Sequence, residues 1–130
     1  MGKIILSTEH APSAIGPYSQ GVSVGNMVFT SGQLPINPVN GQLITDNIQE
    51  ATKQAIENVQ AILSQSGVML DDVVKVTVFV KDLADFSAIN EVYSTYFKEN
   101  CPARSCVQVA RLPLDALLEI EAIAVKKSIV

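Results

Sequence analysis

The run at residues 72–81 constrains the possible folds most strongly, because valine stands at nearly every second position in it. This period of two predicts a β-strand, in which successive side chains point to opposite faces of a sheet. We expect one face to carry Val74, Val76, Val78 and Val80. The other face is expected to carry Val73, Lys75, Thr77, Phe79 and Lys81. A strand with one face in water alternates apolar and polar residues, so large apolar groups on both faces indicate that both are covered.

Residues 48–63 show the period of an α-helix. Apolar residues recur at spacings of three, four and one, which places them on a single stripe. These residues are Ile48, Ala51, Ala55, Val59, Ile62 and Leu63. Asn47 and Glu50 resemble a capping box at the N-terminus of this helix. Gly67 stands where a left-handed glycine commonly ends a helix.

A second helix is expected to begin near Asp85, which is a good N-cap residue, and to end before Pro102. Its buried stripe is predicted to contain Phe86, Ile89, Tyr93, Tyr96 and Phe97. The helical period already explains these aromatic residues, so we interpret them as core residues rather than as a ligand site.

Five further strands are predicted from short apolar runs between turn residues. They are Lys3–Leu6, Ser19–Val24, Met27–Ser31, Ser105–Arg111 and Leu117–Val125. Gly25 and Asn26 fit a two-residue hairpin turn that joins two of these strands. The order of the elements predicts an α+β fold with about six strands and two helices, and the two helices can cover one face of the sheet.

The last predicted strand carries charges within an apolar run. Glu119 and Glu121 stand two residues apart, so they share a face with Ile123 and Val125. Because this face also carries large apolar groups, we expect an oligomer that buries it.

Length and charge exclude several classes of protein. A chain of 130 residues with 48% apolar residues is expected to form one domain, residues 1–130, with its own core. A net charge of −4, with nine Lys and Arg scattered along the chain, argues against nucleic-acid binding. No apolar run is long enough to span a bilayer. We therefore expect a soluble, cytoplasmic protein without a membrane partner.

Few residues could hold a metal ion or act as nucleophiles. The chain has one histidine, His10, and two cysteines, Cys101 and Cys106, without the spacing of a zinc site. We expect both cysteines to be unpaired thiols. Cys106 is either a nucleophile or a small buried side chain, and no neighbouring histidine in the sequence could activate it.

Arg104 and Glu119 are the residues most suited to chemistry. Arg104 follows a proline and opens a strand, so its guanidinium can bind a carboxylate or phosphate in bidentate fashion or form a structural ion pair. Arg111 has the same two alternatives. Glu119 and Glu121 can raise one another's pKa and so provide a proton acceptor, or they can be charges paired with Lys or Arg.

Several segments together resemble the RidA (YjgF) family of reactive-intermediate deaminases. The similar segments lie in order between about Ala11 and Lys126. They begin with Ala-Ile-Gly-Pro-Tyr-Ser-Gln-Gly at 14–21, Thr-Ser-Gly-Gln at 30–33 and Val-Thr-Val-Phe-Val-Lys-Asp-Leu at 76–83. Pro-Ala-Arg-Ser-Cys-Val-Gln-Val-Ala-Arg-Leu-Pro at 102–113 and Glu-Ile-Glu-Ala-Ile-Ala at 119–124 complete the set.

The resemblance implies a chorismate-mutase-like fold with a mixed sheet, assembled as a homotrimer whose active sites lie between subunits. It implies hydrolysis of 2-imino acids or their enamine tautomers, such as 2-iminobutanoate and 2-iminopropanoate, to 2-keto acids and ammonia. This activity protects pyridoxal-phosphate enzymes. The resemblance implies neither a cofactor nor a metal.

The same resemblance assigns roles to individual residues. Arg104 would bind the substrate carboxylate, Glu119 would position or activate water, and Cys106 would line the pocket. Four further residues would bind substrate: Tyr18, Ser31, Gly32 and Asn90. The alternative function is that of an interaction protein, either a partner of regulators or a chaperone-like protein, or of a translation-inhibiting ribonuclease, as described for some family members.

Overall fold

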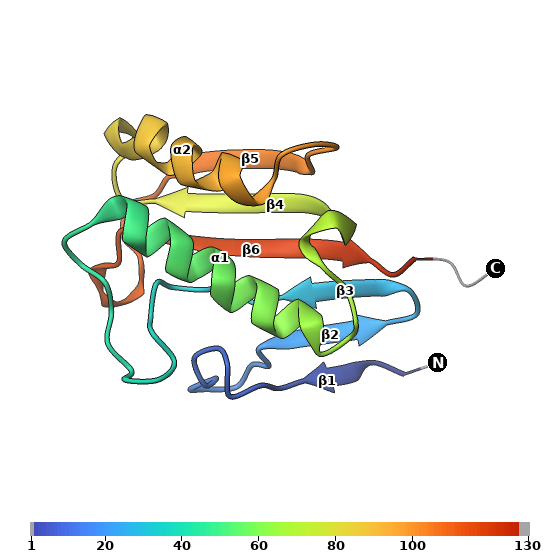
Figure 1. Ribbon diagram of the computed structural model, residues 1–130. Coiled ribbons are helices and arrows are strands. Elements are labelled where there is room, and N and C mark those ends of the chain that lie inside the picture. Colours follow the sequence, from blue (N-terminus) through green and yellow to red (C-terminus); the bar gives the residue numbers. More distant parts are fainter. Residues whose placement is uncertain (1, 128–130) are drawn as a thin grey trace.

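The computed structural model describes residues 2–127, and in this range six strands form one sheet with two α-helices on one face (Figure 1). The strands are β1 (Ile4–Leu6), β2 (Gly21–Val24), β3 (Met27–Thr30), β4 (Val73–Val80), β5 (Ala103–Gln108) and β6 (Leu118–Val125). The helices are α1 (Ile48–Ser64) and α2 (Phe86–Tyr96). The predicted α+β class, with two helices on one face of a six-stranded sheet, is therefore confirmed.

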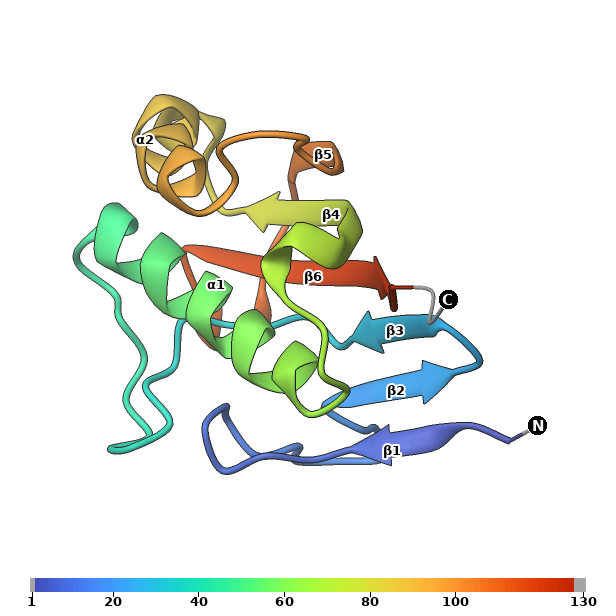
Figure 2. The same cartoon turned by 45° about the vertical axis from the view of Figure 1, so that its right-hand side comes forward.

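The sheet has the strand order β1-β2-β3-β6-β4-β5. All neighbouring strands are antiparallel except β4 and β5, which are parallel. A parallel pair needs a crossover connection, and α2 provides it. Figure 2 shows α1 and α2 on the same side of the sheet, so the opposite face, which we call the open face, is left without a helix.

Helix α1 follows the predicted stripe, and the Asn47 half of the predicted capping box is formed. The Asn47 side chain accepts hydrogen bonds from the backbone N–H groups of Gln49 and Glu50. The helix also buries two polar residues that the apolar stripe does not include. Thr52 Oγ1 donates to the Ile48 carbonyl, and Asn58 Nδ2 donates to the carbonyls of the loop that precedes α1. Gly67 after the helix has a φ of +71°.

Strand β4 differs from its predicted alternation at its first residues. The register shifts between Val73 and Lys75, which is the signature of a β-bulge. Because a bulge adds one residue to one strand, Val73 is buried on the helix face and Val74 is 47% exposed. The predicted faces are therefore wrong for these two residues, whereas Val76, Val78 and Val80 share the helix face as expected.

Helix α2 begins directly after Asp85, as predicted. Asp85 is the N-cap residue, but its side chain accepts no capping hydrogen bond. Instead the Asp82 side chain caps a short 3₁₀ turn, Leu83–Asp85, which leads into α2. Ile89, Tyr93 and Phe97 are buried as predicted, but Phe86 is 38% exposed, because it stands in the first turn of the helix.

Strand β5 begins and ends earlier than predicted. It spans Ala103–Gln108 instead of Ser105–Arg111, because its hydrogen-bonded partner β4 ends at Val80, opposite Gln108. Arg111 therefore lies in the connection to β6 and is exposed.

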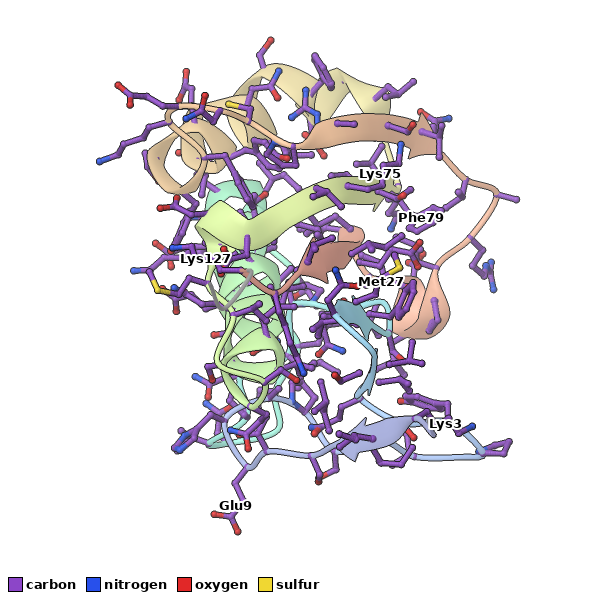
Figure 3. All side chains as sticks on the ribbon, turned by 90° about the vertical axis from the view of Figure 1, so that its right-hand side faces the viewer. Lys3, Glu9, Met27, Lys75, Phe79 and Lys127 are labelled. Carbon is purple, nitrogen blue, oxygen red and sulfur yellow. The ribbon has the colours of Figure 1, made fainter. Side chains whose placement is uncertain are left out.

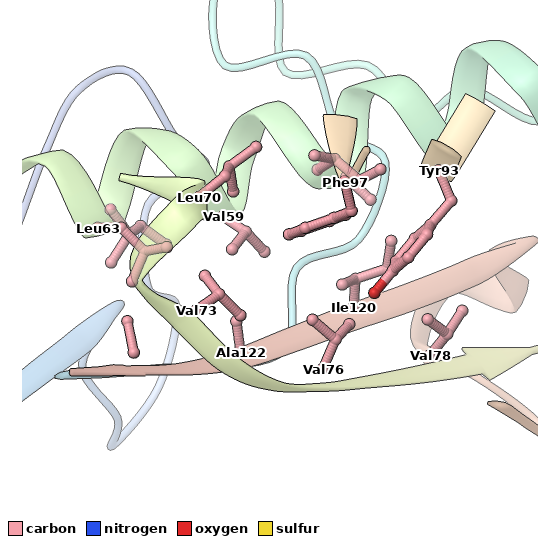
Figure 4. Packing of buried hydrophobic residues seen from close by; sticks show 14 of the residues in the cluster. Val59, Leu63, Leu70, Val73, Val76, Val78, Tyr93, Phe97, Ile120 and Ala122 are labelled. Atoms are coloured by element: carbon pink, nitrogen blue, oxygen red, sulfur yellow. The ribbon is translucent and has the colours of Figure 1, made fainter. Parts of the chain in front are cut away.

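The core lies between the sheet and the two helices. Figure 4 shows Tyr93 of α2 and Phe97, which directly follows this helix, above Val76, Val78, Ile120 and Ala122 of the sheet. None of the described helices is long and apolar enough to cross a membrane.

The open face carries apolar side chains that the core does not use. Figure 3 shows Phe79 and Met27 on the side of the sheet away from the helices. The strand register adds further apolar residues to this face: Ile5, Val22, Val24, Phe29, Val107, Ile123 and Val125. Several are strongly exposed, including Ile5 at 54% and Val107 at 43%. The prediction that both faces of the sheet carry large apolar groups is confirmed.

Candidate active site

The strand register places Arg104 and Glu119 on opposite faces of the sheet. Arg104 of β5 lies beside Val76 of β4, which is buried under the helices. Glu119 of β6 lies beside Phe79, three residues further along β4 and therefore on the open face. The expected site residues thus form two groups in one chain, which we call the Arg104 half-site and the Glu119 half-site.

The Arg104 half-site lies between the edge strand β5 and α2. Phe86, Asn90 and Tyr93 stand at positions i, i+4 and i+7 of α2, so one face of the helix presents all three. Arg104 Nη1 donates a hydrogen bond of 2.8 Å to Asn90 Oδ1. Arg104 Cζ lies 4.6 Å from the centroid of the Tyr93 ring and 5.4 Å from that of Phe86. Both distances fall in the range of cation–π contacts.

Arg104 has no carboxylate partner within residues 2–127, where Lys81 and Asp115 form the only salt bridge. The structural ion pair that the sequence left open for Arg104 is therefore not formed in this range. A guanidinium carries five N–H donors, and Asn90 takes one of them. The partly exposed guanidinium therefore retains donors for a planar anion, and a pocket of about 340 Å³ lies beside it.

Cys106 also belongs to the Arg104 half-site. It lies beside Val78, faces the helices and packs against the core. Burial raises the pKa of its thiol, although the nearby charge of Arg104 acts in the opposite direction. A raised pKa disfavours the nucleophilic thiolate. The pocket beside Arg104 is lined by Cys101 and not by Cys106. Cys101 and Cys106 are both free thiols.

The Glu119 half-site lines a pocket of about 640 Å³. Tyr18, Ser31 and Gly32 line this pocket together with Glu119, so four of the expected site residues meet there. The remaining lining is mixed, with apolar contributions from Ile15, Leu34, Ile36 and Leu114 and polar ones from Gln20, Gln33 and Glu121.

Gly32 lies directly against the Glu119 side chain. The backbone of Gln33 exchanges hydrogen bonds of 2.7 and 3.1 Å with that of Ile120, which brings the two segments together. A Cβ atom at position 32 would collide with Glu119 Oε2 and lie 2.6 Å from Glu119 Cδ. Only glycine therefore leaves room for this carboxyl group.

The loop at residues 8–18, which carries Tyr18 into the pocket, is held by Gln20. The buried side chain of Gln20 donates to the carbonyls of Thr8, Ala11 and Pro12 and accepts from the Thr8 N–H. The Ser31 N–H in turn donates to the Gln20 carbonyl at 2.8 Å. Sequence reasoning did not single out Gln20, which directly precedes β2.

Burial raises the pKa of Glu119, and the neighbouring charge of Glu121 raises it further. The sequence predicted the effect of Glu121, but burial is the larger cause. No Lys or Arg forms an ion pair with either carboxylate in the described range. A carboxyl group with a raised pKa holds a proton more readily than an ordinary glutamate, so it can exchange a proton with water or substrate. The Glu119 half-site therefore offers acid–base chemistry, and the Arg104 half-site offers anion binding.

The aromatic residues beside Arg104 have a second role that the sequence did not predict. Tyr93 is buried as core, as predicted, but both its ring and that of Phe86 contact the guanidinium. Their i, i+4, i+7 spacing with Asn90 could have revealed this.

Within residues 2–127 no three His, Cys, Asp or Glu side chains lie close enough together to hold a metal ion.

Comparison with known proteins identifies the family. Residues 8–126 match the protein family described as Endoribonuclease L-PSP. A RutC family protein of Pyrococcus abyssi is 55% identical over 127 residues, which cover 98% of this chain and all of the relative. The 2-iminobutanoate/2-iminopropanoate deaminase of Escherichia coli is 53% identical over 125 residues, which cover 94% of this chain and 97% of the enzyme.

A solved structure supports the same relationship. The crystal structure of Escherichia coli TdcF with bound serine has a TM-score of 0.92 and 52% sequence identity, and it covers 95% of this chain and 99% of its own. Similarity of this extent in both sequence and structure confirms the RidA resemblance, and the chain belongs to the Endoribonuclease L-PSP family, which includes the RutC-named and deaminase-named relatives.

Proposed function

We propose that this protein hydrolyses 2-imino acids, such as 2-iminobutanoate and 2-iminopropanoate, to 2-keto acids and ammonia. The observation that carries the proposal is the partly exposed Arg104 guanidinium, which has a neutral hydrogen-bond partner and no ionic one within residues 2–127. A positive charge held in this way is suited to bind the carboxylate of a small substrate. The deaminase name of a relative that is 53% identical supports the choice of reaction.

In the proposed reaction, Arg104 binds the substrate carboxylate and thereby fixes the neighbouring C=N carbon. The imine nitrogen enters protonated, and Glu119 accepts a proton as water adds to the carbon, which gives a neutral carbinolamine. The same carboxyl group returns this proton to nitrogen. It then takes the hydroxyl proton as the C=O bond forms and ammonia leaves, and it passes that proton to the ammonia or to solvent. The raised pKa of Glu119 suits these transfers. Cys106 forms no covalent bond.

The same proposal includes a homotrimer whose active sites lie between subunits. Arg104 and Glu119 face opposite sides of one sheet, so they act on one substrate only if the second half-site comes from another chain. The apolar open face supports association, since contiguous apolar surface of this kind marks an interaction site. In a cyclic trimer each Arg104 half-site meets the Glu119 half-site of the next chain, which gives three equal sites.

Mixing two inactive variants tests the shared site. Arg104→Ala and Glu119→Gln should each lose activity as homo-oligomers. When equal amounts are unfolded and refolded together, each site needs one intact Arg104 and one intact Glu119. Random assembly then restores roughly one quarter of the wild-type activity. Two variants refolded separately and mixed afterwards are the control, and a refolded mixture without activity would contradict a shared site.

The activity itself is tested with an imine formed by a pyridoxal-phosphate enzyme. Threonine dehydratase with threonine releases the imine, and semicarbazide traps what is not hydrolysed. The wild-type protein should lower semicarbazone formation relative to a sample without protein. Degradation of RNA by the same preparation, with semicarbazone unchanged, would favour the nuclease named in the family description instead. The carboxylates of Glu119 and Glu121 in the larger pocket oppose a polyanionic substrate.

A further inference from the structure

We infer that Phe86 and Tyr93 are positioning residues that hold the Arg104 guanidinium in the orientation required to bind the substrate carboxylate. The inference rests on the proposed function and extends it from the charged residue to the helix face that supports it. It concerns how strongly substrate binds, and it assigns no chemical step to either ring.

The first argument is geometric. Arginine has a long side chain with several rotatable bonds, and an edge strand such as β5 restricts it little. Here three residues of one helix face restrict it: the Asn90 amide oxygen at 2.8 Å fixes one nitrogen, and two rings lie against the guanidinium at 4.6 and 5.4 Å. A guanidinium held by a hydrogen bond and two rings loses less rotational freedom when it binds a carboxylate.

The second argument is electrostatic. A π-face attracts a cation without neutralising it. An Asp or Glu in place of these rings would form an ion pair and occupy the donors that a substrate needs. Within residues 2–127 the contacts of Arg104 come from an amide and two aromatic rings, all of them neutral. The arrangement therefore orients Arg104 while it leaves the full positive charge for the substrate.

The third argument concerns the rigidity of Tyr93. The residue is 93% buried and its ring packs on Phe97, with 4.6 Å between ring centroids. Figure 4 shows the ring reaching from α2 toward the sheet beside Val78 and Ile120. Its hydroxyl group has no hydrogen-bond partner in the described range, so the ring and not the hydroxyl accounts for the placement. The core therefore holds the surface on which Arg104 lies.

The experiment compares ring removal with hydroxyl removal. Tyr93→Leu removes the ring, whereas Tyr93→Phe keeps it and serves as the matched variant. Phe86→Leu is the second test variant, because Phe86 is 38% exposed and its loss leaves the core intact. Tyr96→Leu, on the same helix but hydrogen-bonded to Glu57 instead of near Arg104, is the control.

Two measurements are made on each folded variant. The first is the ¹⁵N–¹H NMR signal of the Arg104 Nε–H, which ring currents shift in the wild type. Tyr93→Leu and Phe86→Leu should lose part of this shift, and Tyr93→Phe and Tyr96→Leu should keep it. The second is the kinetics of imine hydrolysis, in which Tyr93→Leu and Phe86→Leu should raise KM about threefold to thirtyfold with a smaller change in kcat.

The outcomes separate the inference from the proposed function. An unchanged Arg104 signal and unchanged KM in Phe86→Leu and in folded Tyr93→Leu would overturn the inference, as would equal effects from Tyr93→Phe or Tyr96→Leu. If Tyr93→Leu does not fold, Phe86→Leu decides alone. If the wild type hydrolyses no imine and binds no 2-oxobutanoate, the proposed function fails, and the NMR signal still decides whether the rings position Arg104.

Discussion

Gly32 and Glu119 illustrate how one atom can decide the position of a functional group. The missing Cβ of Gly32 is the space that the Glu119 carboxyl group occupies. The atoms that a larger residue would meet belong to the end of a flexible side chain, so Glu119 could swing away without disturbing the backbone. The residue at position 32 therefore determines where the Glu119 carboxyl group lies, and it has little effect on the fold.

Gly32→Ala should fold normally and lose most of its activity, because the methyl group displaces the Glu119 carboxyl from the pocket. A displacement of about 1 Å in a reacting group can cost roughly a hundredfold in rate. We expect kcat/KM to fall by about this factor while the melting temperature changes little. Gly2→Ala, at an open position, is the control, and full activity in Gly32→Ala would contradict the close contact.

Glu121 should tune the pH dependence of the reaction. Its charge raises the pKa of Glu119, and Glu119 must be ionised to accept a proton from water. Activity therefore rises with pH through the pKa of Glu119. In Glu121→Gln this pKa falls, so the acid limb of the kcat/KM profile should move to lower pH. The shift is limited because burial, the larger cause, remains. An acid limb that moves to higher pH in Glu121→Gln would refute this assignment.

At the scale of the elements, Asn58 links α1 to the loop that leads from Gly32. Its side chain is fully buried and donates to the carbonyls of Leu34 at 3.1 Å and Ile36 at 2.9 Å. The helix thereby fixes the path of a segment that lines the larger pocket.

Asn58→Ala should lower the free energy of unfolding by about 2 kcal/mol, because two buried carbonyls lose their partner. Urea unfolding followed by circular dichroism measures the change. Gln60→Ala, at an exposed position of the same helix, should have little effect. If Asn58→Ala lowers the free energy of unfolding no more than Gln60→Ala does, the hydrogen bonds of Asn58 do not stabilise the fold.

The elements also show what the sequence can predict. The apolar stripe of α1 and its Asn47 cap depend on local spacing, so both are visible in the sequence. The bulge at Val73 is not, because it depends on how β4 pairs with β6, which stands more than 40 residues later. The start of α2 after Asp85 was predicted, but the capping bond of Asp82 was not, since Asp85 and Asp82 are equally good caps until the turn between them is known.

The same distinction applies to the candidate site. Family resemblance pointed to Arg104, Glu119 and their neighbours by position, and the structure brings them together in two groups. That the groups lie on opposite faces follows from strand register, which pairs residues far apart in the chain. The alternation of apolar and polar residues within a single strand could not reveal this division between faces, because it does not say how the strands pair.

At the scale of the whole molecule, the open face should control assembly. Wild-type protein at micromolar concentration should sediment at roughly three times the chain mass of 13.9 kDa. Phe79→Asp places a charge in the middle of the apolar open face and should yield monomers without activity. Lys53→Glu, on the exposed surface of α1, should leave the mass unchanged. A Phe79→Asp protein that keeps the wild-type mass would place the interface elsewhere.

The division of the half-sites between two faces of one sheet bears on how activity depends on protein abundance. If each site is completed by a neighbouring chain, a newly made or diluted monomer is inert, however well it is folded. Specific activity then falls on dilution, and it falls with more than the first power of concentration because three chains must meet. Such a protein acts only above a threshold concentration. Activity measured on samples diluted through the range in which the trimer dissociates would reveal this concentration.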